Sequence, residues 1–135
     1  MKVIATLLVI FGLIIAIVPQ FTSCESQGRV IEMANGRSMP MKCHWTARAE
    51  IAVGTPMLAV GVLTFTSRRK ESLRVLAILG MLLGVFAILI PTYLIGVCAS
   101  FEMLCNSLMK PTLIFGGVVV SIASLIGLGL VNRDE

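Results

Sequence analysis

Four long stretches of this chain contain no charged side chain, and they limit its fold more than any other feature. They cover residues 3–19, 51–67, 75–97 and 111–131. Each has roughly the 17–25 residues that a helix needs to cross the hydrocarbon core of a bilayer. Helices are expected because lipid cannot satisfy open backbone groups. The sequence therefore predicts an all-α membrane protein, a four-transmembrane-helix bundle that forms a single domain in the lipid bilayer.

Composition supports the same class of protein. The chain is 57% hydrophobic and 13% charged, against roughly 45–50% and 25% in soluble domains. A water-facing surface needs more charge, so an independent soluble enzyme domain is excluded. Disorder is excluded too, because disordered chains have low hydrophobicity. With a single histidine, no nucleophile oriented by a charged group and no phosphate-binding glycine loop, the sequence offers no catalytic site, and we expect no enzyme activity.

The placement of lysine and arginine predicts the orientation. Loop 68–74 carries four basic residues and one acidic residue, and Lys2 and Arg133 flank the first and last stretches. We therefore expect this loop and both termini on the cytoplasmic side of the cell (inner) membrane. Loops 20–50 and 98–110 then face outward. The net charge of +4 is explained by this topology, and nucleic acid is not an expected partner.

The first apolar stretch has a second interpretation. Lys2 followed by a long apolar run is typical of a cleaved signal peptide. The sequence Phe21-Thr22-Ser23-Cys24 is also similar to a lipoprotein cleavage site, although Phe is unusual at its first position. We favour a retained helix.

All four cysteines lie in, or at the edge of, the two outward-facing loops. They are Cys24, Cys43, Cys98 and Cys105. Disulfides form and persist outside the cytoplasm, and four cysteines allow three pairings. We favour Cys24–Cys43 and Cys98–Cys105, each within one loop, and cross-loop pairing stays open.

Each outer loop has a predicted structure. In the first, residues 29–34 and 37–42 flank Asn35-Gly36, the strongest short signal for a two-residue hairpin turn. In that register Ala34 faces Arg37 and Gly28 faces Cys43, so a Cys24–Cys43 disulfide would close the hairpin base. The alternative is an irregular loop with a local turn. In the second, a short helix against the bundle is expected, because apolar residues recur at helical spacing: Phe101, Leu104, Cys105 and Leu108.

Small residues recur inside the apolar stretches and predict close helix packing. They include Gly54, Gly61, Gly80, Gly84, Gly116 and Gly117. Packing within the bundle is the simpler interpretation, and a groove for a partner is the alternative. Four short helices make a small bundle, which favours a homo-oligomer or docking to a larger membrane partner.

The segment Cys43-His44-Trp45-Thr46-Ala47-Arg48-Ala49-Glu50 stands at the outer mouth of the second stretch. It holds the only His and the only Trp of the chain. Trp45 suits an interface anchor and Cys43 a disulfide, and we assign His44, Trp45, Arg48 and Glu50 to an outer cap that meets a partner. A carboxylate at the membrane boundary is costly unless paired, so we expect a basic partner for Glu50: Arg48, Arg29 or Lys110.

The same segment resembles a signature of a family of small, uncharacterised four-helix prokaryotic membrane proteins. These carry a Cys-His-Trp-Thr-Ala-x-Ala-Glu block before the second span, matched here by Cys43 to Ala47, Ala49 and Glu50, and the similarity extends to the layout of the spans. The resemblance implies an accessory subunit that works with an export-type ATP-binding-cassette (ABC) permease. The architecture is also similar to claudin-type proteins, in shape alone, because their Trp-Gly-Leu-Trp block is absent.

We therefore expect a non-catalytic accessory subunit of a larger membrane complex, such as an ABC-type exporter, and no cofactor. One alternative is extracytoplasmic handling of copper(I) through the soft donors Met39, Met41, Cys43 and His44, or of haem through His44. A further alternative is a thiol–disulfide membrane protein, which usually needs a Cys-x-x-Cys pair that this chain lacks.

Overall fold

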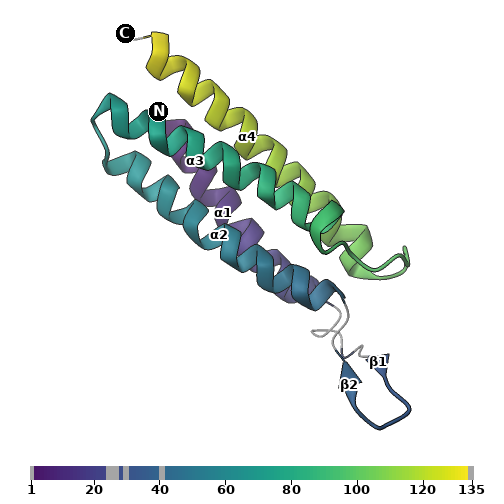
Figure 1. Ribbon diagram of the computed structural model, residues 1–135. Helices are drawn as coiled ribbons and strands as arrows, with labels where there is room; N and C mark the ends of the chain where they lie inside the picture. The colour runs from purple at the N-terminus through teal and green to yellow at the C-terminus, as the bar shows by residue number, and fades with distance from the viewer. Residues whose placement is uncertain (1, 24–27, 29–30, 40–41, 134–135) are drawn as a thin grey trace.

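The computed structural model describes residues 2–23, 28, 31–39 and 42–133. These residues form four long helices packed side by side, as Figure 1 shows. The helices are α1 (Lys2–Thr22), α2 (Lys42–Thr66), α3 (Lys70–Leu89) and α4 (Lys110–Arg133). Two short segments extend them, η1 (Ile90–Leu94) after α3 and η2 (Cys105–Met109) before α4. With these extensions, all four helices are long and apolar enough to cross a membrane, the pattern of a multi-pass membrane protein.

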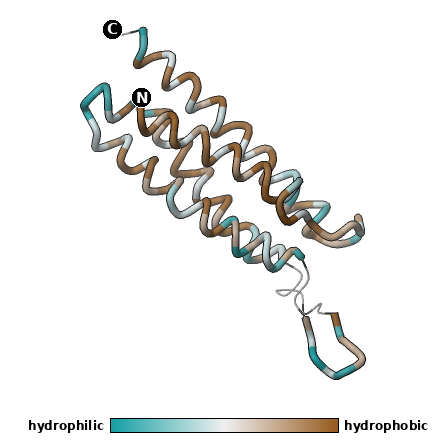
Figure 2. The backbone as a smooth tube through the Cα atoms, viewed as in Figure 1, coloured by the Kyte–Doolittle hydropathy of each residue, from teal (hydrophilic) through white to brown (hydrophobic). Residues whose placement is uncertain are grey.

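The bundle has two distinct ends. The beginning of α1, the α2–α3 connection and the end of α4 lie together at one end, which we call the terminal end (Figure 1). The opposite end holds the beginning of α2, η1 and η2, and we call it the cysteine end. Hydrophobic residues dominate the helices, and hydrophilic residues gather at the connection between α2 and α3 and in the hairpin (Figure 2).

Apolar side chains cover the outside of the bundle as well as its interior. Leu82 and Phe86 of α3 are each 48% exposed, whereas Leu8, Met57 and Leu113 are almost fully buried. A soluble helix would place polar residues on its outer face. The outer faces of these helices therefore suit an apolar environment.

Small residues let neighbouring helices approach closely. A Cβ atom added to Gly54 of α2 would lie 2.9 Å from Ala16 of α1, and one added to Gly84 of α3 would lie 2.9 Å from the backbone oxygen of Gly117 in α4. The other glycines noted in the sequence face helices of the same bundle: Gly61 faces Val9, Gly80 faces Ser124, and Gly116 faces Phe11 and Ile15. At these positions the small residues serve contacts within the chain.

The short separate helix predicted in loop 98–110 is not what the structure shows. Cys105 and Leu108 do not belong to a separate helix, because η2 runs directly into α4. Pro111 explains the form of this junction, since proline cannot donate a backbone hydrogen bond and its ring crowds the preceding turn. The turn widens, and the Lys110 backbone N–H donates to the oxygen of Cys105, five residues back. Phe101 lies in a turn outside the helix and is 86% exposed.

The predicted hairpin is present, with a different register. Strands β1 (Ile31–Glu32) and β2 (Ser38–Met39) pair antiparallel, with Ile31 opposite Met39. The expected pairing of Ala34 with Arg37 is wrong by one residue.

The turn chemistry explains the shift of register. Gly36 has a positive φ of 73°. Asn35 does not have a positive φ, and neither does any other described non-glycine residue. A two-residue turn of the predicted type needs positive φ at both positions, whereas a three-residue loop needs it only at the last. The backbone of Met33 accordingly donates to Arg37 at 3.0 Å across the loop.

Candidate functional site

Three cysteine sulfurs meet at the cysteine end of the bundle. Cys43, at the start of α2, forms a disulfide with Cys105 of η2, and their Cα atoms lie 6.5 Å apart. The Sγ atom of Cys98 lies 2.9 Å from that of Cys43. All three sulfurs lie within 4.8 Å of one another. We call Cys43, Cys98 and Cys105 the sulfur cluster.

The disulfide corrects the pairing favoured from the sequence. Cys43 pairs across the loops with Cys105, so neither Cys24–Cys43 nor Cys98–Cys105 forms, and the hairpin is not closed at its base. The reason is helix packing, because it buries the start of α2 and η2 in one core in which Cys43 and Cys105 are both fully buried. Cys24 lies outside the described residues.

Hydrogen bonds fasten the start of α2 to its neighbours. Thr46 is fully buried, and its hydroxyl donates to the backbone oxygen of Gly96 at 2.7 Å. The side-chain amide of Gln20 in α1 donates to the backbone oxygen of Ala47 at 3.2 Å. Together with the disulfide, these bonds join α1, α2 and the segment after η1 at this end.

The Cys-His-Trp segment divides between two faces of α2. Its buried side chains are Cys43, Thr46, Ala47 and Glu50. Trp45 is 58% exposed, with the His44 ring edge-on to it at 5.7 Å between centroids, and Arg48 is exposed. The residues assigned to one cap therefore do not form one surface, because Glu50 points into the bundle.

Glu50 has an unusual environment for a carboxyl group. Its side chain is fully buried, and neither oxygen has a hydrogen-bond partner in the described part of the chain. The predicted ion pair with Arg48 or Lys110 does not form, and Arg29 lies outside the described residues. The prediction placed Glu50 at the membrane boundary because the apolar stretch begins at Ile51. The helix begins earlier, at Lys42, and carries Glu50 into the interior.

A pocket of about 320 Å³ adjoins the sulfur cluster. Cys98, Asn106 and Lys110 contribute to its lining, along with residues of η1 and of the segment that follows it. Cys98 is only partly buried, in contrast to the two disulfide sulfurs. The pocket therefore gives access from outside to one sulfur of the cluster.

Among the described residues of the copper set proposed from the sequence, Met39 and Cys43 are not brought together. Met39 lies on the hairpin and is 51% exposed, whereas Cys43 is fully buried in the bundle and bonded to Cys105. His44 contacts Trp45, and Met41 lies outside the described residues. The soft donors that do converge are Cys43, Cys98 and Cys105. No motif spacing in the sequence indicates this cluster, and the only signal was that all the cysteines fall at one end.

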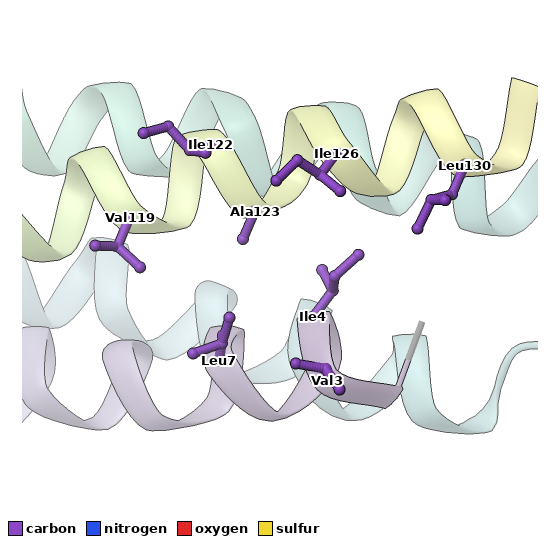
Figure 3. Close-up of a pocket in the computed structure, with 8 residues that line it drawn as sticks. All are labelled: Val3, Ile4, Leu7, Val119, Ile122, Ala123, Ile126 and Leu130. Carbon is purple, nitrogen blue, oxygen red and sulfur yellow. The ribbon is translucent and has the colours of Figure 1, made fainter.

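A larger pocket, of about 510 Å³, lies between α1 and α4 toward the terminal end. Figure 3 shows apolar side chains of both helices around it, with Ile4 and Leu7 across from Ala123 and Ile126. Its lining offers no polar or nucleophilic group for chemistry. The cysteine end is therefore the candidate functional site.

Comparison with protein-family models supports the prediction that this chain belongs to an uncharacterised family. A family model described as a domain of unknown function (DUF4418) matches residues 8–130. The chain belongs to the DUF4418 family. This family is uncharacterised, and the match runs from within α1 to within α4 of the DUF4418 protein. Searches of curated proteins and of solved structures give no match.

Proposed function

We propose that this DUF4418 protein is a non-catalytic interaction subunit of a larger membrane complex, such as an exporter, and that its hairpin contacts the partner. The observation that carries the proposal is the uncovered apolar face of the hairpin. Every described residue from 31 to 39 is exposed, so neither face of the hairpin packs against the bundle. Isolated two-stranded hairpins are marginally stable in water, and a partner surface would stabilise this one.

The strand register gathers the apolar side chains on one face. Ile31 lies opposite Met39, and Met33 follows Ile31 by two positions, so the three side chains point the same way. They are 51%, 51% and 44% exposed. Glu32 and Ser38 form the pair on the opposite face. Arg37 lies opposite Met33 and two positions before Met39, so it stands on the same face next to the turn. This face is thus mainly apolar and suits a protein surface, whereas the opposite face is polar.

The charges of the terminal end support an orientation with the hairpin outside the cell. Basic residues gather at that end, where Lys70 begins α3 and Arg74 donates to the side chain of Asn132 at 2.7 Å. Short loops rich in lysine and arginine remain on the cytoplasmic side. The disulfide at the opposite end agrees, since disulfides persist outside the cytoplasm. We therefore propose that the cysteine end and the hairpin face outward.

Crosslinking from the two faces of the hairpin tests this proposal. A photoreactive phenylalanine analogue is placed at Ile31 or Met39, and in matched variants at Glu32 or Ser38, at native expression level. We expect one defined membrane protein to crosslink from the apolar face and little or none from the polar face. Crosslinks to lipid alone, or equal crosslinks from both faces, would refute the docking role.

Charge substitution provides a quantitative measurement. Ile31→Lys combined with Met39→Lys should reduce co-purification of that partner in mild detergent by about tenfold or more, because apolar anchors each contribute on the order of 1–2 kcal/mol. Glu32→Lys combined with Ser38→Lys adds the same side chains to the other face and should leave co-purification intact. Retention of the partner by the first variant would contradict the proposal.

A further inference from the structure

We propose that the sulfur cluster is a copper(I) site that opens when the Cys43–Cys105 disulfide is reduced. This site differs from the hairpin surface, and the two proposals fail separately because the hairpin variants leave the cysteines unchanged. The geometry of the cluster supports the copper site, since three sulfurs from distant parts of the chain already lie within 4.8 Å of one another. The distance from Cys43 to Cys98, 2.9 Å between sulfurs, leaves only a small rearrangement for both to bind one ion.

The donor set favours copper(I) over other metals. Thiolates are soft ligands that select copper(I), zinc or iron–sulfur clusters. Structural zinc sites almost always use four ligands, whereas the described residues bring together three sulfurs. The surroundings are also apolar, because Cys43 and Cys105 share the core with Met109. A three-sulfur site in this setting suits a monovalent soft ion.

Reduction of the Cys43–Cys105 disulfide provides two of the three copper ligands. A dithiol on the same side of the membrane transfers two electrons and two protons to the disulfide and leaves as a disulfide itself, so that Cys43 and Cys105 become thiols. Each sulfur that then binds copper(I) releases its proton. Copper stays in the +1 state throughout. Transfer of two electrons back to a disulfide acceptor re-forms the Cys43–Cys105 bond, removes two ligands and releases the ion.

The pocket beside Cys98 provides an entry path and a compensating charge. Cys98 is partly exposed in the pocket that Asn106 and Lys110 also line. An ion entering there meets Cys98 first and the buried sulfurs behind it. A copper(I) ion bound by several thiolates carries net negative charge, which is costly to bury, and the positive charge of Lys110, which lines the same pocket, offsets part of it.

Copper(I) titration of the purified full-length chain, in competition with a chromogenic copper(I) chelator, tests the inference. The reduced chain should bind one copper(I), and the oxidised chain should bind none. Cys98→Ser leaves the disulfide partners in place and should lower the affinity of the reduced chain at least about 100-fold, since even outer-shell groups contribute 10–100-fold. Thermal unfolding of the variant without copper checks that it is folded.

His44→Ala and Met39→Ala are the matched controls, because they remove donors of the alternative Met/Cys/His set. Both should bind copper(I) like the wild type, and X-ray absorption should show sulfur neighbours and no nitrogen. The inference is overturned by equal binding in oxidised and reduced chains, or by an unchanged affinity of Cys98→Ser. It is also overturned if His44→Ala weakens binding, or if the reduced chain takes up zinc and not copper(I).

Discussion

Replacing Glu50 with methionine should make this protein more stable. Glu50 is fully buried in α2, and neither of its oxygens has a hydrogen-bond partner among the described residues. The carboxyl group therefore loses its hydration on folding without gaining a replacement. Methionine is also unbranched and has a similar length, and it carries no polar atom that needs a strong partner.

The size of the effect follows from two opposing contributions. Burying a polar group without a hydrogen bond costs roughly 1–3 kcal/mol in protein mutational data. A substitution that conserves volume usually costs less than about 1.5 kcal/mol through imperfect packing. We therefore expect Glu50→Met to raise the free energy of unfolding by about 1–2 kcal/mol.

Unfolding by a denaturing detergent, followed by circular dichroism of the purified chain, measures this change. Glu102→Met is the matched control, because Glu102 is exposed at the same end of the bundle, and exposed substitutions usually change stability by less than about 0.5 kcal/mol. A loss of more than about 1 kcal/mol in Glu50→Met would refute the reasoning, since it would mean that a partner holds the carboxyl group. A more stable variant that fails to co-purify with its membrane partner would indicate that the carboxyl group is retained for function.

Two further substitutions test the packing and the fastening of the cysteine end. A methyl group at Gly84 would meet a backbone oxygen of α4 at 2.9 Å, so Gly84→Ala should destabilise the bundle by about 1–3 kcal/mol in the same unfolding assay. Gly129→Ala, where nothing lies within 4 Å, should be neutral or stabilising, and equal effects would contradict the close approach. Thr46→Val removes the 2.7 Å bond to Gly96 and should cost about 1–3 kcal/mol. The exposed hydroxyl of Thr55 bonds only within its own helix, so Thr55→Val should cost little. Its unfolding midpoint is the reference against which that of Thr46→Val is compared.

Local composition predicted the helices well because each apolar stretch specifies its own structure. A helix in lipid satisfies all its backbone hydrogen bonds within one segment, so the absence of charge over residues 75–97 was enough to indicate one. The hairpin was also predictable from Asn35-Gly36, but its register was not. That register depends on whether one or both residues of this pair adopt positive φ, and of the two only Gly36 does so.

The pairing of the cysteines and the burial of Glu50 lay beyond the sequence, because both depend on contacts between distant segments. Cys43 and Cys105 are 62 residues apart, and only the packing of the helices into one core brings them together. From the sequence, Glu50 was expected at the membrane boundary. In the structure α2 begins at Lys42, and the Glu50 side chain lies inside the bundle. The sequence by itself determined four apolar helices and a common end for the cysteines, since hydropathy and charge act locally along the chain. The tertiary structure alone decided which sulfurs and which carboxyl group meet in the interior, because helix packing sets the distances between residues far apart in sequence.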